Sequence, residues 1–341
     1  MPNFIFSLGS IVVIHEMLMA KGLIAPQIDF LLFLQNIRIQ TGGVFDNFFL
    51  EITTLGELLF PTLFMCLIYW CVDFRAGIYL FTLNSFGLYF AKLFKMVGCV
   101  YRPWILDNKV KPIESALQAS GGYSFPSGHT AMAAASWGGM AYLVRKNKVL
   151  CSILIILVLL IAFSRNYVGV HTPQDVIVSL FIGLICIFAV DKLLNWCEKD
   201  KNRYLYVMAI IDLVALITLY YVITKSYPQD FVNGKVLVDP THAIYIMVVY
   251  MGWIVGITNG VLLCAKFLRF DPKQGSIYSR VIRGFIGMVI MLILFKIMYP
   301  IFFHGIHDYK ITFVSLFTVG FFITAGYPFL FSKLHFLLKK Q

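Results

Sequence analysis

Three polar clusters interrupt an otherwise apolar chain, and their residue types suit the binding of an anion and a nucleophilic attack on it. The clusters are the stretch from Lys95 to Arg102 and Pro103, the run Pro126-Ser127-Gly128-His129, and Ser164-Arg165 followed by His171 and Asp175. Lys95, Arg102 and Arg165 are fixed cations that together can neutralise a dianion, and each guanidinium can do so through two parallel hydrogen bonds. A helix that begins at Gly128 would add backbone N–H groups without an intrahelical partner. The clusters therefore predict a phosphate cradle.

The second and third clusters also hold candidates for the chemical step. His171 is a candidate nucleophile, and Asp175, four residues later, can hold the second ring nitrogen and fix the tautomer. His129 can donate a proton to the leaving group. These residues predict a nucleophilic histidine, assisted by an orienting acid and a separate proton donor.

The elements that must position these residues follow from the composition. The chain has 341 residues, of which 60% are hydrophobic and only 13% are charged. A soluble domain has about 25% charged residues, so the composition argues against a soluble enzyme and excludes a disordered chain. The net charge is +11, which in so apolar a chain indicates basic loops beside a membrane and no nucleic-acid partner.

The hydropathy pattern predicts an all-α polytopic membrane bundle of about nine transmembrane helices. A spanning helix needs roughly 20 mostly apolar residues. The segments that qualify are 55–72, 76–98, 127–144, 149–167, 174–194, 204–224, 242–263, 284–303 and 311–331. Three parts follow: an N-terminal interfacial amphipathic segment at 1–54, a five-span core at 55–195 and a four-span extension at 196–341. A tenth span near 4–24 remains an alternative.

Loop charges predict the orientation of the bundle. Lys and Arg residues concentrate after the third, fifth, seventh and ninth predicted spans, and alternating spans place all of these loops on one side. The positive-inside rule makes that side cytoplasmic, so the N-terminus is expected outside and the C-terminus inside. All three polar clusters then meet at the outer ends of the helices, which predicts an extracytoplasmic site. The composition suggests a bacterial plasma membrane.

The three clusters resemble the signatures of a known family. Kx6RP, PSGH and SRx5HxxxD are the motifs of the type 2 phosphatidic acid phosphatases, and each is complete here, within 55–195. The resemblance implies that His171 forms a phosphohistidine, that Asp175 supports it, and that His129 protonates the leaving group and later activates water. It implies that the phosphoryl oxygens bind to Lys95, Arg102, Ser127, the Gly128 backbone and Arg165. It also implies that no metal or other cofactor is needed. The nine-span layout is similar to that of glucose-6-phosphatase.

The expected function is a membrane phosphatase acting on the phosphate or diphosphate of a lipid. Polyprenyl diphosphate is the first substrate expected, followed by phosphatidate-type lipids, with the lipid bilayer as the other partner. A phosphatase for a soluble sugar phosphate, a lipid phosphotransferase and, less favoured, a transporter are the alternatives. The sequence does not separate transfer from hydrolysis, because both share the first half-reaction.

Several polar residues also have plain structural interpretations. Lys95 and Arg165 are placed where long side chains snorkel to a membrane interface. The sequence around Thr172 and Asp175 is also that of an ordinary helix start. Within the extension, Asp212 and Lys296 are charges inside predicted spans at similar depth, so we predict an ion pair between them.

Overall fold

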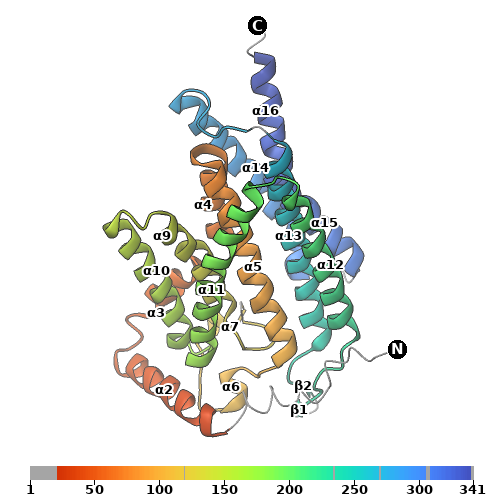
Figure 1. The fold of residues 1–341 in the computed structure, drawn as a ribbon. Coiled ribbons are helices and arrows are strands. Elements are labelled where there is room, and N and C mark those ends of the chain that lie inside the picture. The colour runs from red at the N-terminus through yellow and green to blue at the C-terminus, as the bar shows by residue number, and fades with distance from the viewer. Residues whose placement is uncertain (1–20, 119, 233–234, 269, 305–307, 339–341) are drawn as a thin grey trace.

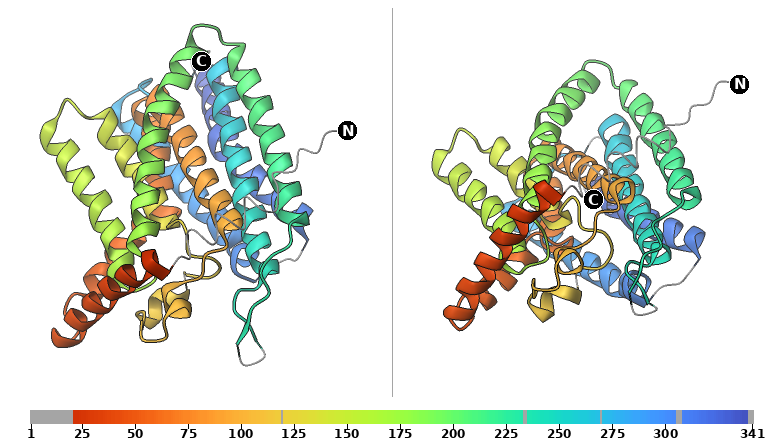
Figure 2. Two further views of the ribbon diagram at one scale, coloured as in Figure 1. Left: turned by 60° about the horizontal axis from the view of Figure 1, so that its bottom comes forward. Right: turned by 90° about the horizontal axis from the view of Figure 1, so that it is seen from below.

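The computed structural model describes residues 21–118, 120–232, 235–268, 270–304 and 308–338. They form a bundle of long helices that run roughly side by side, with short helices and loops gathered at one end (Figures 1 and 2). Two strands of two residues each, β1 (Phe231–Val232) and β2 (Lys235–Val236), pair antiparallel beyond that end. The predicted all-α architecture is confirmed.

Each apolar segment expected to span the membrane lies largely on helix. In chain order the helices of the bundle are α4 (Leu59–Leu67) with the π-helical turn Ile68–Val72, α5 (Phe74–Gly98), α8 (Gly128–Ala133) continued by the π-helical turn Ala134–Gly138 and α9 (Gly139–Leu143), α10 (Lys148–Tyr167), α11 (Pro173–Glu198), α12 (Arg203–Thr224), α13 (Pro240–Phe267), α14 (Ile277–His304), and α15 (Tyr309–Phe321) continued by the π-helical turn Phe322–Gly326 and α16 (Tyr327–Leu338). The short helices α6 (Pro103–Leu106) and α7 (Glu114–Gln118) lie in the loop between α5 and α8.

The count of nine spans is not confirmed. Among the described residues, five stretches are long and apolar enough to cross a membrane, namely Lys148–Tyr167, Pro173–Glu198, Arg203–Thr224, Pro240–Phe267 and Tyr309–Ser332. A sixth is obtained if Asp46–Thr54 and Leu59–Val72, bent by 47°, form one broken span. Helix α5 is long enough but carries Arg75, Lys92 and Lys95, and the helical stretch 128–143 is shorter than the roughly 20 residues that a span needs.

The predicted N-terminal interfacial segment contains α2 (Lys21–Gln40) and α3 (Asp46–Thr54). Helix α2 lies across the end of the bundle that also carries α6 and the β1–β2 hairpin (Figure 1). Most of the alternative tenth span, 4–24, lies outside the described residues. The interfacial role of 1–54 stays a prediction.

Local sequence signals fix the start of each helix that carries predicted site residues. Asp73 caps α5 by accepting a hydrogen bond from the Ala76 backbone N–H at 2.8 Å. Ser127 caps α8, and Thr172 caps α11 with Pro173 in the first turn. These caps place the residues of the second and third clusters at adjoining helix ends.

Helix α13 joins the C-terminal extension to the front half of the chain, because it is packed between α5 and α15. Gly252, Gly256 and Gly260 repeat every fourth residue, and a Cβ at Gly256 would lie 2.2 Å from the Phe317 carbonyl oxygen. Glycine therefore permits the close approach of α13 and α15. On another face, Ile254 shares a buried cluster with Leu88 of α5. The four-span extension thus packs directly against the five-span core.

The predicted ion pair between Asp212 and Lys296 is wrong. Among the described residues, Asp212 accepts hydrogen bonds from the side-chain amide of Asn259 on α13, at 3.1 and 3.3 Å, and no ion pair joins it to Lys296. Lys296 is exposed on the outside of the bundle. Similar depth in the membrane did not place the two side chains on facing helix surfaces.

Candidate active site

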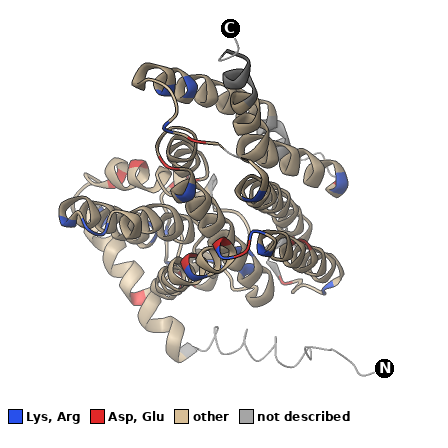
Figure 3. Ribbon diagram, turned by 45° about the horizontal axis from the view of Figure 1, so that its top comes forward, with Lys and Arg blue, Asp and Glu red and all other residues tan. Residues whose placement is uncertain are grey.

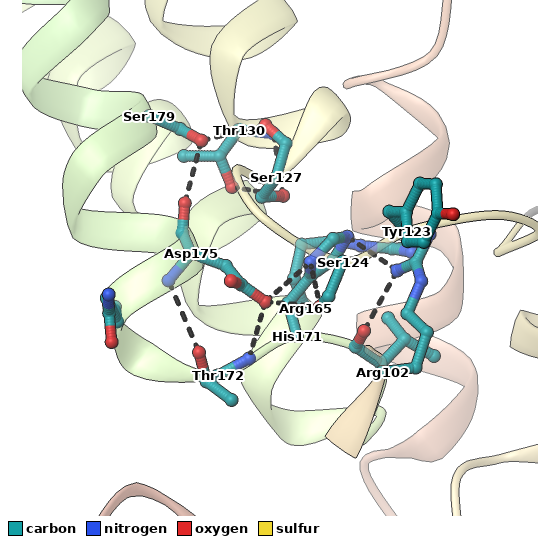
Figure 4. A network of polar contacts seen from close by, with 12 residues as sticks. Arg102, Tyr123, Ser124, Ser127, Thr130, Arg165, His171, Thr172, Asp175 and Ser179 are labelled. Atoms are coloured by element: carbon teal, nitrogen blue, oxygen red, sulfur yellow. Dashed lines mark hydrogen bonds and ion pairs between the residues drawn. The ribbon is translucent and has the colours of Figure 1, made fainter. Parts of the chain in front are cut away.

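His171 lies in the loop between α10 and α11, held between Arg102 and Asp175 (Figure 4). Its Nδ1 is 3.0 Å from Asp175 Oδ2, and its Nε2 is 2.9 Å from Arg102 Nη1. A guanidinium only donates hydrogen bonds, so Nε2 must accept and Nδ1 must carry the ring hydrogen. The arrangement therefore fixes the tautomer in which Nε2 has a free electron pair, as a nucleophile requires.

Asp175 is held by the loops around it as well as by its own helix. The same oxygen, Oδ2, accepts hydrogen bonds from Ser124 Oγ at 2.5 Å and from the Thr172 backbone N–H at 3.0 Å. The Thr172 side chain in turn accepts from the Asp175 backbone N–H, which completes a capping box at the start of α11. Asp175 thus closes the capping box of α11 and orients His171 with the same carboxylate oxygen.

His171 is neutral in this environment. Its side chain is only 2% exposed, and burial lowers the pKa of His171 well below its usual range. The positive charges of Arg102, Lys95 and Arg165 lower this pKa further. Burial also lowers the pKa of Arg102, to about 10. Because this pKa is still above neutral pH, Arg102 keeps its positive charge there. A neutral histidine beside fixed cations is suited to attack a bound anion.

The three predicted phosphate-binding cations converge here without carboxylate neutralisation. Lys95 Nζ donates to the carbonyl oxygens of Tyr123 and Ser124, at 3.0 and 2.6 Å. Arg165, which is 1% exposed, donates to Thr53 Oγ1 at 2.7 Å and to Ser120 Oγ at 3.2 Å. Among the described residues, none of the three cations has a carboxylate oxygen within 4.0 Å. Buried positive charge that is left unpaired favours an anionic ligand.

Ser127 and Gly128 form the helix start that was predicted to complete the cradle. Ser127 Oγ accepts hydrogen bonds from Thr130 Oγ1 at 3.0 Å and from its backbone N–H at 3.4 Å, so the hydroxyl serves the helix cap. The Ser127 carbonyl accepts a hydrogen bond from Ser179 Oγ of α11. Direct contacts from Ser127 and from the Gly128 backbone to phosphate stay predictions.

His129 has a neighbour that the sequence motifs did not indicate. Its Nε2 is buried, makes no hydrogen bond to a described residue, and lies 3.6 Å from Glu57 Oε1. Glu57 sits just before α4, far from His129 in the chain, and is half-exposed. The Glu57 carboxylate is placed to stabilise the protonated imidazole, the form that a proton donor needs, against the larger opposing effects of burial and of the Arg165 charge. Glu57, Ser124, Thr53 and Ser120 are the site neighbours that sequence reasoning missed.

Replacing Glu57 with glutamine is expected to lower the turnover rate about tenfold, because His129 would hold its proton less readily. The alkaline limb of the pH–rate profile should also move to lower pH. The measurement is initial rate against pH for wild type and Glu57→Gln, with Glu51→Gln of α3 as a control that removes an exposed carboxylate. An unchanged alkaline limb would show that Glu57 does not assist His129.

Among the described residues, no group of three or more His, Cys, Asp or Glu side chains is arranged to hold a metal ion.

Two family models match the chain. Residues 75–199 match the PAP2 superfamily, and residues 248–340 match the transmembrane extension of PAP2 superfamily phosphatases. The chain belongs to the PAP2 superfamily. The family indicated by the three motifs is therefore confirmed, and with it an integral membrane protein.

Three curated proteins that are named as phosphatases are similar to parts of the chain. The chain is 29% identical to phosphatidylglycerophosphatase B of Bacillus subtilis over 138 residues, which is 37% of this chain and 66% of the relative. It is 32% identical to an undecaprenyl-diphosphatase of Sulfolobus acidocaldarius over 109 residues, 32% of this chain and 50% of the relative. It is 27% identical to lipid phosphate phosphatase delta of Arabidopsis thaliana over 161 residues, 44% and 39% respectively.

The alignments thus span between 39% and 66% of the length of these relatives. No solved structure matches the chain significantly. The family is shown by sequence, and the roles of the individual site residues are argued from the geometry.

Proposed function

We propose that this protein is a membrane phosphatase that hydrolyses a lipid phosphate monoester or diphosphate through a phosphohistidine. The observation that carries the proposal is the pair of contacts around His171, in which Asp175 holds Nδ1 and Arg102 donates to Nε2. An arriving phosphoryl group can take over the Arg102 donor and meet the same nitrogen. The PAP2 membership and the relatives named for lipid phosphates support this substrate class.

The reaction has two steps. Nε2 of His171 attacks phosphorus, and Asp175 stabilises the positive charge that develops on the ring. Lys95, Arg102 and Arg165 neutralise the phosphoryl oxygens in the transition state, and His129 protonates the departing oxygen. Water activated by His129 then cleaves the phosphohistidine and releases phosphate.

The position of the site supports a lipid substrate on the extracytoplasmic side. The loop between α10 and α11, which carries His171, lies at the end of the bundle near α2 (Figure 1). At a helix end the active site can bind a headgroup while the lipid chain stays in the bilayer. Figure 3, which tilts the opposite end toward the viewer, shows Lys and Arg positions on the ribbon near helix ends there. The positive-inside rule makes that opposite end cytoplasmic.

Phosphate release by the purified protein tests this proposal. Lipid diphosphates, lipid monophosphates and sugar phosphates are offered in turn, each with and without EDTA. We expect lipid substrates to be hydrolysed, sugar phosphates to be poor substrates, and EDTA to leave the rate unchanged, because fixed cations take the place of a metal.

Each contrary result has a distinct meaning. Preferred hydrolysis of sugar phosphates would contradict the lipid assignment. Complete loss of activity with EDTA would contradict the metal-free mechanism. Failure to release phosphate from any substrate would contradict the proposed function itself.

A further inference from the structure

Lys92 is a fourth cation near Lys95, Arg102 and Arg165, and the three motifs do not include it. It lies on α5 one turn before Lys95. Its Nζ is 4.0 Å from the position that a Cβ would take at Gly128, next to His129. Lys92 therefore faces the start of α8, on the side of the site that carries the proton donor.

The Lys92 ammonium has no polar partner among the described residues, with neither a hydrogen bond nor an ion pair. Lys95, by contrast, donates to two backbone carbonyl oxygens. An ammonium has three donors, and no described residue accepts a hydrogen bond from any of them. The hydrogen-bonding capacity of Lys92 is therefore available to a ligand.

Tyr250 of the C-terminal extension holds Lys92 in this place. The ammonium lies over the Tyr250 ring, 3.6 Å from its centroid. Tyr250 is on α13, which packs against α5 and shares the buried contact of Ile254 with Leu88. A cation–π contact of this kind restrains an ammonium without consuming its donors. Tyr250 thus brings the C-terminal extension next to the candidate active site.

The chemistry of the leaving group indicates what Lys92 is for. When a phosphate monoester is cleaved, the leaving group is an alcohol, which is neutral once His129 has protonated it. When a diphosphate is cleaved, the leaving group is a phosphate monoester, which keeps negative charge after one protonation. A cation beside the proton donor stabilises the second kind of leaving group and has little to act on in the first.

We propose that Lys92, positioned by Tyr250, binds the second phosphate of a lipid diphosphate and gives the site a preference for diphosphates. This inference rests on the proposed phosphatase function. Nε2 of His171 forms a bond to the terminal phosphorus while the bond between that phosphorus and the bridging oxygen breaks. The electron pair stays on that oxygen, which takes the proton of His129, and the remaining charge of the departing monoester lies at Lys92. Water then cleaves the phosphohistidine, returns a proton to His129 and releases orthophosphate.

The test compares farnesyl diphosphate with farnesyl monophosphate, which share one lipid chain. For each variant the quantity is the ratio of kcat/KM for the diphosphate to kcat/KM for the monophosphate. Lys92→Met and Tyr250→Leu should each lower this ratio, by about tenfold for Lys92→Met, since a charge-assisted hydrogen bond is lost. Lys92→Arg and Tyr250→Phe, which keep the charge and the ring, should recover most of it. Lys109→Met removes an exposed lysine from the loop after α6 and should leave the ratio unchanged.

A ratio that stays within about twofold of wild type in Lys92→Met would overturn the inference, and so would an equal loss on both substrates. Binding provides a second readout that needs no turnover. Inorganic pyrophosphate should raise the melting temperature of wild type more than orthophosphate does, and Lys92→Met should abolish the difference. An equal effect of the two anions on wild type would also overturn it. Absence of phosphate release from either substrate by wild type would instead contradict the proposed function.

Discussion

His171→Ala is expected to lose at least about 1,000-fold in the rate of phosphate release, because the atom that forms the covalent bond is removed. The contacts of His171 in the structure show why no neighbour replaces it. Nε2 is the ring nitrogen with a free electron pair, and the nearest polar group, the Arg102 guanidinium, can only donate. The measurement is phosphate release from a lipid diphosphate by purified wild type and variant, with elution volume and melting temperature as checks on folding.

Added imidazole provides the control for this variant. If the loss comes from the missing nucleophile, imidazole in solution should restore part of the rate in His171→Ala and leave wild type unchanged. If the loss came from a distorted loop, imidazole would have no effect. Retention of most of the activity in a folded His171→Ala protein would refute the nucleophile assignment.

Asp175→Asn is expected to lower the rate by about 10²- to 10⁴-fold while the protein stays folded. The side-chain oxygen of Asn can accept the same hydrogen bond from the Thr172 backbone N–H, so the capping box and the start of α11 should survive. The negative charge that stabilises the developing imidazolium does not survive. Rate and melting temperature measured together therefore separate the catalytic role of Asp175 from its role in the capping box.

Asp175→Ala is the matched variant, because it removes both the charge and the side-chain hydrogen bond that Asp175 contributes to the capping box. It should lose activity to a similar degree as Asp175→Asn but should also melt at a lower temperature. If Asp175→Asn kept the wild-type rate within a few-fold, Asp175 would serve the capping box only, and the catalytic role proposed for its charge would be wrong.

The local features of the site could be predicted from the sequence because they depend on short stretches of chain. Thr172, Pro173 and Asp175 indicate a helix start, and the structure has the capping box there. Four residues separate His171 from Asp175, and the contact across that spacing is 3.0 Å. Topology alone predicted that segments as distant as Arg102 and His171 would meet, since both lie at the same end of neighbouring helices.

Contacts between faces of distant helices could not be predicted in this way. The prediction that Asp212 pairs with Lys296 used depth in the membrane, but depth does not say which side of a helix faces inward, and the partner is Asn259. Glu57 and Tyr250 belong to no motif, and their contacts with His129 and Lys92 depend on how α4 and α13 pack. Such contacts become visible only when the whole bundle is assembled.

The central claim is that Nε2 of His171 carries the phosphoryl group during turnover. Rapid quenching after mixing wild type with substrate labelled in the transferred phosphate tests it directly. The account predicts a protein-bound label that is stable in alkali, labile in acid, located at His171 and absent from His171→Ala. Label on another residue, or full turnover in wild type with no label trapped at any time, would contradict it.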